Sequence, residues 1–352
     1  MSWQGIIHEF RDFMPPIKDS AICSLNEGNT ILLRANWLSH RIGNDLDIYL
    51  KFEGQNPTGS FKDRGMTMAI SKAIEEGARA VICASTGNTS ASAAAYAAVA
   101  DLPCAVLIPQ GKIARGKLAQ AIFYGAKVIQ VDGNFDEALA VVREIAGKYP
   151  VTLVNSVNPY RIPGQRSGAF EVVDQLSGRS PDYHCIPVGN AANICAYWQG
   201  YKMYKDAGRC KTLPRMIGFQ AAGSAPIYFN KVVEKPETIA TAIRIGNPAS
   251  WQLALDTVKE SNGLIDIVTD EEILDAQRLI AKTQGIFCEP GSAASVAGVI
   301  KKAKEGFFEK GASIVCVLTG HGLKDPESAI QGMPEPYMLK PDAKGVLKIL
   351  GL

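Results

Sequence analysis

The ten residues NPTGSFKDRG, at positions 56–65, connect a predicted strand to a predicted helix. The apolar run 48–52 before them is typical of a buried strand, and 61–76 has the length and composition of a helix. Ser60 is well placed as the helix N-cap, which puts Lys62 in the first turn. Ligands of α/β proteins bind at the carboxyl ends of parallel strands, so this junction is the first candidate site.

The same order of strand and helix continues along the chain. Further apolar runs resemble strands, and most are followed by a segment of helical length. We therefore predict an α/β fold with mainly parallel sheets. The predicted strands are 48–52, 80–84, 104–108, 127–131, 151–154, 184–188, 216–219 and 314–318, and the predicted helices are 61–76, 91–100, 115–124, 135–148, 192–207 and 270–283.

Length and charge bound the possibilities further. The chain has 352 residues, which at roughly 100–150 residues per domain indicates two domains. Lys and Arg total 37 against 35 Asp and Glu, and the formal net charge of +2 supplies no broad field for nucleic acid or an anionic membrane. Any anion must therefore be bound by a few local groups.

Cysteine placement and the N-terminal sequence favour a reducing cytoplasm. Several of the eight cysteines lie in short apolar runs and no two have Cys-x-x-Cys spacing, so we expect buried free thiols and no metal site. The N-terminus lacks the apolar core of a secretory signal. The most apolar stretch, 90–109, is interrupted by Asp101 and Pro103, which argues against a membrane span.

Lys62 is a candidate nucleophile. A helix start and the neighbouring Arg64 both disfavour the ammonium form, and an amine that forms Schiff bases needs a pKa below the usual ~10.4. The alternative is a solvated surface lysine paired with Asp63, and spacing alone favours that alternative.

Two polar turns after predicted strands could hold small anions. Residues 85–89, Ser-Thr-Gly-Asn-Thr, offer hydroxyls, a carboxamide and backbone N–H groups that suit a carboxylate, although an ordinary helix N-cap explains them equally well. Residues 189–193, Gly-Asn-Ala-Ala-Asn, open a helix and suit a phosphate. They lack Gly-x-Gly-x-x-Gly, so a dinucleotide is not expected. Thr319 places a hydroxyl directly after the last predicted strand, or simply belongs to the turn that ends it.

Taken together, these segments resemble a known family. NPTGSFKDRG, ASTGNTSASAAAYA (84–97), VGNAANI (188–194) and LTGHGLKDP (318–326) resemble the threonine synthases, pyridoxal-phosphate enzymes of the tryptophan-synthase β fold type, also called fold type II. GFQAAGSAP (218–226) and ATAIRIGNPASW (240–251) look specific to threonine synthases. The resemblance implies a larger domain formed by 1–55 and 155–352, which binds the cofactor phosphate. It also implies a smaller, mobile domain, 56–154, which carries the substrate-carboxylate loop.

The resemblance also implies how pyridoxal 5'-phosphate is held. Lys62 would bind it as a Schiff base, and Asn88 would donate a hydrogen bond to its phenolic oxygen. Thr319 would contact its ring nitrogen, where a hydroxyl disfavours transamination. The phosphate would lie on Gly189, Asn190, Ala191, Ala192 and Asn193. Ala192 departs from the family pattern, since similar loops carry glycine there, and we expect this alanine to adopt ordinary helical dihedrals.

The implied reaction is that of a carbon–oxygen lyase acting on a phosphate, the last step of threonine biosynthesis. O-phospho-L-homoserine and water would give L-threonine and phosphate by γ-elimination and β-addition of water, with Lys62 as the base. Arg161 is the chemically persuasive phosphate ligand because a guanidinium binds phosphate bidentately, although an ion pair on a loop is its alternative. The substrate carboxylate would contact Ser85, Thr86 and Thr89, and the substrate phosphate Thr89, Asn155, Ser156, Arg161 and Asn190, with Lys117 a weaker candidate.

Three alternatives remain open from the sequence. A threonine or serine dehydratase, or a cysteine synthase, would share the lysine and both anion loops but would not need a second phosphate site. A pyridoxal-phosphate sensor or carrier without activity would not need an intact Lys62. The family resemblance also implies a homodimer.

Overall fold

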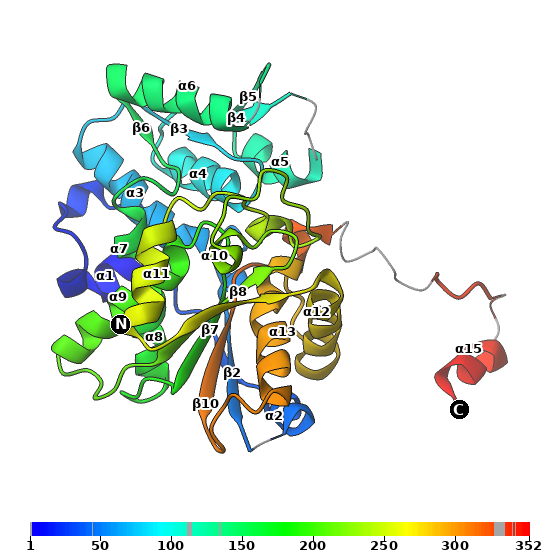
Figure 1. Ribbon diagram of the computed structural model, residues 1–352. Helices are drawn as coiled ribbons and strands as arrows, with labels where there is room; N and C mark the ends of the chain where they lie inside the picture. Colours follow the sequence, from blue (N-terminus) through cyan, green and yellow to red (C-terminus); the bar gives the residue numbers. More distant parts are fainter. Residues whose placement is uncertain are drawn as a thin grey trace.

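The chain forms two sheets, each covered by helices on both faces, in a computed structural model (Figure 1). The structure describes residues 2–43, 45–110, 115–133, 135–326, 335–339, 341 and 343–352. The predicted α/β class with mainly parallel sheets is confirmed. None of the described helices combines the length and apolar character that a membrane span requires.

The larger sheet has the strand order β1-β2-β10-β7-β8-β9. Among its described strands, only β1 runs antiparallel to its neighbour, at the edge beside β2. Along β10 the side chains alternate between two cores, since Ile314 and Cys316 pack with one set of helices and Val315 with the other. The strands are β1 (Leu32–Arg34), β2 (Asp47–Phe52), β7 (Tyr183–Pro187), β8 (Arg215–Ala221), β9 (Leu264–Val268) and β10 (Ser313–Leu318).

The smaller sheet is entirely parallel, in the order β5-β4-β3-β6. Val81 and Val106 face one apolar cluster and Ile82 and Leu107 face another, so both faces are buried as expected of a parallel sheet. All four strands fall within the predicted smaller domain, whose boundaries stay a prediction. The strands are β3 (Ala80–Ala84), β4 (Cys104–Pro109), β5 (Lys127–Val131) and β6 (Val151–Leu153).

Helices α2, α12 and α13 contribute to the core on one face of the larger sheet, and α8, α9 and α11 to the core on the other. On the smaller sheet, α3, α4 and α5 cover one face and α6 the other. The α-helices are α1 (Ile6–Glu9), α2 (Asn36–Ile42), α3 (Lys62–Glu75), α4 (Asn88–Val99), α5 (Arg115–Phe123), α6 (Phe135–Lys148), α7 (Arg161–Gln165), α8 (Ser167–Gln175), α9 (Ala192–Asp206), α10 (Pro226–Phe229), α11 (Trp251–Glu260), α12 (Asp270–Gln284), α13 (Pro290–Lys304) and α15 (Ala343–Leu350). The short 3-10 helices are η1 (Arg11–Phe13), η2 (Asp19–Ala21), η3 (Glu53–Gln55), η4 (Thr241–Ile243) and η5 (Gly322–Lys324).

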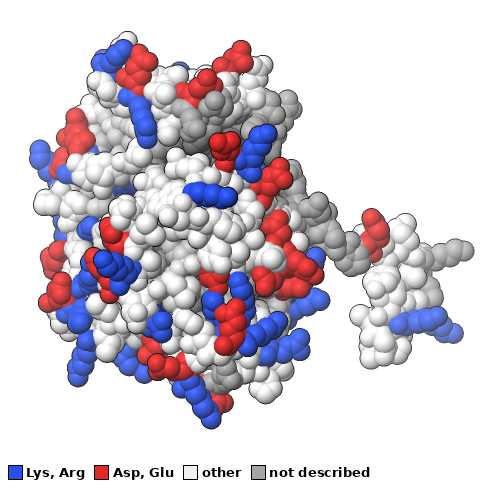
Figure 2. Space-filling model, in the orientation of Figure 1, with Lys and Arg blue, Asp and Glu red and all other residues white. Residues whose placement is uncertain are grey.

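Every strand and helix predicted from the sequence is present, with ends shifted by a few residues. Strands β1 and β9 were not predicted, and β9 is a short apolar run interrupted by Asp266. The eight cysteines are buried free thiols, as predicted. Figure 2 shows acidic and basic side chains interspersed over the visible face, with no broad patch of one sign among the described residues.

Candidate active site

The two sheets meet where α3 begins beside the end of β10. Ser60 and Gly320 form an antiparallel bridge, Phe61 N donates to Thr319 O at 3.0 Å, and His321 N donates to Gly59 O at 2.9 Å. Strand β10 pairs with β7, whose end leads into the 189–193 loop. The lysine, the strand-end hydroxyl and the phosphate loop are therefore brought to one edge of the larger sheet.

Lys62 opens α3, with Phe61 rather than Ser60 at the N-cap position. Ser60 Oγ instead accepts from Lys62 N at 3.4 Å. The Lys62 amine lies 4.1 Å from the centroid of the Phe61 ring and forms no ion pair within the described part of the chain. Burial is the main cause that lowers the pKa of Lys62 to about 7. Arg161 lowers it further, while Glu289 opposes the shift.

Asp63 does not neutralise Lys62. Its buried carboxylate accepts from Thr58 N at 2.7 Å, Thr58 Oγ1 at 2.6 Å and Ser92 Oγ at 2.5 Å. Burial outweighs these hydrogen bonds and raises the pKa of Asp63 to about 6. The alternative of a solvated lysine paired with Asp63 is therefore wrong. Asp63 joins α3 to the preceding loop and to α4.

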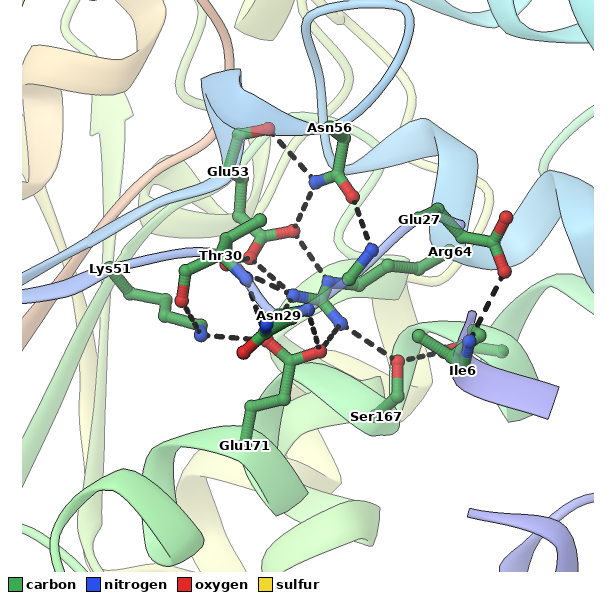
Figure 3. Close-up of polar contacts among 12 residues, drawn as sticks. Ile6, Glu27, Asn29, Thr30, Lys51, Glu53, Asn56, Arg64, Ser167 and Glu171 are labelled. Atoms are coloured by element: carbon green, nitrogen blue, oxygen red, sulfur yellow. Dashed lines mark hydrogen bonds and ion pairs between the residues drawn. The ribbon is translucent and has the colours of Figure 1, made fainter. Parts of the chain in front are cut away.

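Arg64 also points away from Lys62, into what we call the buried charge cluster: Lys51, Glu53, Arg64 and Glu171 (Figure 3). Arg64 Nε lies 2.6 Å from Glu53 Oε2, and its Nη1 lies 2.6 Å from Glu171 Oε1. Burial disfavours the charge on Arg64, but Glu171 and Glu53 outweigh it and raise the pKa of Arg64 well above its ordinary value. Residues two apart on a helix face different directions, so Arg64 was wrongly expected to act on Lys62.

Arg161 is the cation that does act on Lys62. It opens α7, it is buried, and its Nη1 donates to Val154 O at 2.8 Å. Among the residues that the structure describes, its Nε has no hydrogen-bond partner and no carboxylate forms an ion pair with it. Burial lowers the pKa of Arg161 to about 10. A Cβ on Gly65 would lie 2.6 Å from Arg161 Nε, so the glycine lets the guanidinium pack against α3.

The 85–89 loop connects β3 to α4. Asn155 fixes the end of β3, since its amide accepts from Ala84 N at 2.9 Å and donates to Ala84 O at 2.8 Å. Ser85 Oγ accepts from Gly87 N at 3.3 Å. In the described region the side chains of Thr86, Thr89 and Ser156 make no hydrogen bond, and all three are partly exposed. Lys117 belongs to α5, but its side chain lies outside the described residues.

Asn88 and Thr319 both contact residues that the sequence analysis missed. Asn88 Nδ2 lies 3.1 Å from both carboxylate oxygens of Glu289, and Thr319 Oγ1 lies 3.0 Å from Ser292 Oγ. Both partners stand at the start of α13, which was not predicted. Pro290 immediately after Glu289 is a helix-start signal that could have drawn attention to them.

The 189–193 loop presents donors to an anion at the start of α9. Ala191 is the N-cap and has a left-handed φ of 65°, and no side chain caps the helix. The buried Asn193 Nδ2 has no hydrogen-bond partner within the described part of the chain. Asn190 Oδ1 accepts from Ala249 N at 3.3 Å. Ala192 has ordinary dihedrals as predicted, and the left-handed residue is its neighbour Ala191.

These residues fit pyridoxal phosphate. An uncapped helix start with an orphaned buried amide N–H suits its phosphate, and a partly buried amine with a pKa near neutrality suits its aldehyde. Asn193 and Lys62 supply these two features from helices α9 and α3, which pack on different sheets. No group of three described His, Cys, Asp or Glu side chains is arranged to hold a metal ion.

Comparison with known proteins agrees with this geometry. The family model for pyridoxal-phosphate dependent enzymes matches residues 23–320. Threonine synthase of Synechocystis sp. is 57% identical over 351 residues, covering 99% of this chain and 91% of that protein. Threonine synthase of Methanocaldococcus jannaschii is 50% identical over 352 residues, covering 98% and 87%.

The solved structures that resemble this one show the same fold. Maize serine racemase has a TM-score of 0.75 at 18% identity, covering 99% of this chain and 97% of that one. The processed form of threonine deaminase isoform 2 from Solanum lycopersicum has a TM-score of 0.74 at 20% identity, covering 95% and 96%. At these identities the likeness concerns the fold alone.

Proposed function

Because this chain belongs to the threonine synthases among the pyridoxal-phosphate-dependent enzymes, we propose that it converts O-phospho-L-homoserine and water to L-threonine and phosphate. The observation that carries the proposal beyond the family is that the buried Arg161 and the partly buried Lys62 have no carboxylate ion-pair partner among the described residues. Lys62 and Arg161 lie at the edge where the two sheets meet, and a substrate with an amine, a carboxylate and a phosphate would use both.

The cofactor would be held by residues from both sheets. Lys62 would bind it covalently, Asn88 would donate to its ring oxygen, and Thr319 would face its ring nitrogen. Residues 189–193 would bind its phosphate through backbone N–H groups and Asn193 Nδ2. The bound cofactor supplies an electron-withdrawing ring that stabilises negative charge at the substrate carbons.

Lys62 would then carry the protons. With a pKa of about 7, its free amine exists in both forms near neutral pH, which is what a group that accepts and returns protons requires. It would accept a proton from Cα and then from Cβ. Phosphate would leave from Cγ, water would add at Cβ, and Cγ would be reprotonated.

Arg161 would bind the substrate phosphate. A buried guanidinium without an anionic partner is costly, and a phosphate would satisfy it through charge-assisted hydrogen bonds. Thr89, Ser156 and Asn190 would add donors, with Lys117 as a further candidate. Asn155 would act by fixing the loop at Ala84, because its amide is already bonded there. Ser85, Thr86 and Thr89 would bind the substrate carboxylate.

A dehydratase or a cysteine synthase is the alternative activity, and it does not require the second anion site. The deciding experiment incubates the holoenzyme separately with O-phosphohomoserine and with threonine. Release of phosphate together with threonine supports the proposal. Formation of 2-oxobutyrate from threonine, without phosphate release from O-phosphohomoserine, contradicts it.

We further propose that 1–55 with 155–352 and 56–154 are separate domains, that the enzyme is a homodimer, and that it is cytoplasmic. The placement of all four strands of the smaller sheet within 80–153 supports the division. The eight buried free thiols support a reducing compartment. Small-angle scattering with and without substrate, and sedimentation of the holoenzyme, test closure and oligomeric state.

A further inference from the structure

Glu289 is a buried carboxylate beside the candidate site, with a role that sequence patterns did not indicate. It is 3% exposed, and its backbone N–H donates to Gly320 O at 3.0 Å. It occupies the N-cap position of α13, yet its side chain accepts no hydrogen bond from the first turn of that helix. Burial raises its pKa, so a contact other than helix capping must justify its position.

That contact is with Asn88, the first residue of α4, which packs on the smaller sheet. Both Glu289 oxygens lie 3.1 Å from Asn88 Nδ2. A carboxylate only accepts hydrogen bonds, so the amide of Asn88 must turn its NH₂ group toward Glu289. The second N–H of the same NH₂ group then points in a fixed direction away from Glu289. Without this anchor the terminal torsion of an asparagine has two broad wells, in which the oxygen and nitrogen exchange places.

The surroundings leave room for this carboxylate, and three neighbours partly offset the cost of burying its charge. A Cβ on Gly320 would lie 2.5 Å from Glu289 Oε1, so only the glycine after Thr319 leaves the space. Asn88 favours the charged form most, followed by Lys324 and Lys62, while burial and Asp325 oppose it. Neither lysine comes within ion-pair distance of Glu289 in the described structure, so Asn88 remains the direct partner.

We propose that Glu289 is a positioning residue, which holds the Asn88 amide so that one N–H points at the ring oxygen of the bound cofactor. This inference rests on the proposed function, because it concerns the cofactor that Lys62 and Asn88 would hold. Glu289 itself makes no contact with the reacting atoms.

A double-mutant cycle on the full-length chain tests whether Glu289 acts through Asn88. The dissociation constant for pyridoxal phosphate is measured by titration, read from the visible absorbance, in wild type, Glu289→Gln, Asn88→Ala and the double variant. We expect Glu289→Gln to weaken binding about tenfold, as for one hydrogen bond to a charged group, but less than about twofold when Asn88 is already alanine. Equal weakening in both backgrounds would overturn the inference.

Two further variants separate position from charge. Glu289→Asp keeps the charge near Lys62 but shortens the reach toward Asn88, and we expect it to weaken binding as Glu289→Gln does. Wild-type affinity in Glu289→Asp would mean that the charge alone matters. Asp266 is a largely buried carboxylate paired with Lys301 and Lys302 at the opposite end of α13, so Asp266→Asn is the matched control and should leave affinity unchanged.

The same titration distinguishes failure of this inference from failure of the proposed function. If wild type develops no visible absorbance with pyridoxal phosphate, or if Lys62→Ala retains it, the proposed function fails. If wild type behaves as proposed and the cycle shows no coupling between Glu289 and Asn88, only the positioning role fails.

Discussion

Two residues on the same turn of α3 have opposite electrostatic surroundings. Arg64 is buried with Glu53 and Glu171 as ion-pair partners at 2.6 Å each, and its pKa is raised. Lys62 has no such partner among the described residues, and burial lowers its pKa to about 7. The same contrast separates the two buried arginines, since no described carboxylate pairs with Arg161 and its pKa is lowered. Burial alone therefore does not mark a site, whereas buried charge without a partner does.

Energetics explain why the two regions differ. In the buried charge cluster, two cations and two anions compensate one another. Burial favours the neutral form of Glu171, but Arg64 and Lys51 overcome it and lower the pKa of Glu171 to about 2. Such a cluster is destabilised strongly when one member is removed. The desolvation cost of the unpaired cations in the site is not offset until an anion binds. Their interactions therefore contribute to the free energy of ligand binding rather than to that of folding.

Among the variants that test this contrast, Lys62→Ala should have the largest effect on activity. Removing the amine should abolish the visible absorbance of the bound cofactor and lower kcat at least about 10³-fold, since both the covalent link and the proton carrier are lost. Absorbance spectra and steady-state kinetics measure these effects. The cofactor-free variant should be no less stable than wild type, and a large loss of stability would place Lys62 with the structural residues.

Arg64→Met should lower the stability of the folded protein, because it removes a paired buried charge. Glu53 and Glu171 would lose their main counter-charge inside the protein, and we expect the free energy of unfolding to fall by about 3–5 kcal/mol. Urea denaturation followed by circular dichroism measures this change. A loss below about 1 kcal/mol would show that the cluster does not depend on Arg64.

Arg161→Met is the matched variant at the second buried arginine. No ion pair is lost, so stability should change by less than about 1 kcal/mol, while kcat/KM for O-phosphohomoserine should fall at least about 100-fold. Cofactor affinity should stay as in wild type. Kinetics that match wild type would remove Arg161 from the substrate site, and a stability loss like that of Arg64→Met would make it structural.

The lowered pKa of Lys62 also predicts how stability depends on pH. Between the folded pKa of about 7 and the unfolded value of ~10.4, the unfolded chain binds one more proton at this position, so raising the pH stabilises the folded protein. Over that range the cofactor-free wild type should gain about 1.4 kcal/mol per pH unit relative to Lys62→Met. Parallel denaturation series at several pH values measure the difference, and a constant offset would contradict the lowered pKa.

The sequence predicted the parts of the site that follow strands. Lys62 and Asn88 open the helix that follows a strand, and Gly189 and Thr319 directly follow one. Their meeting at one sheet edge could therefore be inferred from the α/β pattern. Local order along the chain was enough.

Partners that are distant in the sequence could not be predicted. Glu171 lies 107 residues from Arg64, and Glu289 lies 201 residues from Asn88. Helix propensity and spacing carry no information about such pairs, because the choice between Glu53, Glu171 and a ligand is made by packing. For the same reason the sequence named Arg64, two residues away, as the cation acting on Lys62, whereas Arg161 holds that role.

The smallest predicted effect concerns the phosphate loop, where the left-handed residue is Ala191 rather than Ala192. A left-handed conformation costs an alanine about 1–2 kcal/mol. Glycine removes this strain, but its more flexible unfolded chain offsets part of the gain in stability. Ala191→Gly should therefore stabilise the protein by up to about 1 kcal/mol. Ala192→Gly, one residue into α9 with ordinary dihedrals, is the control.

For Ala192→Gly we expect a loss of about 0.5–1 kcal/mol and a cofactor affinity within a few-fold of wild type. Thermal denaturation of the two variants beside wild type measures the opposite signs. If both glycine variants destabilise equally, the left-handed conformation at Ala191 carries no strain. If Ala192→Gly instead tightens cofactor binding tenfold or more, the strain in the loop lies at Ala192, and Ala191 is relaxed despite its positive φ.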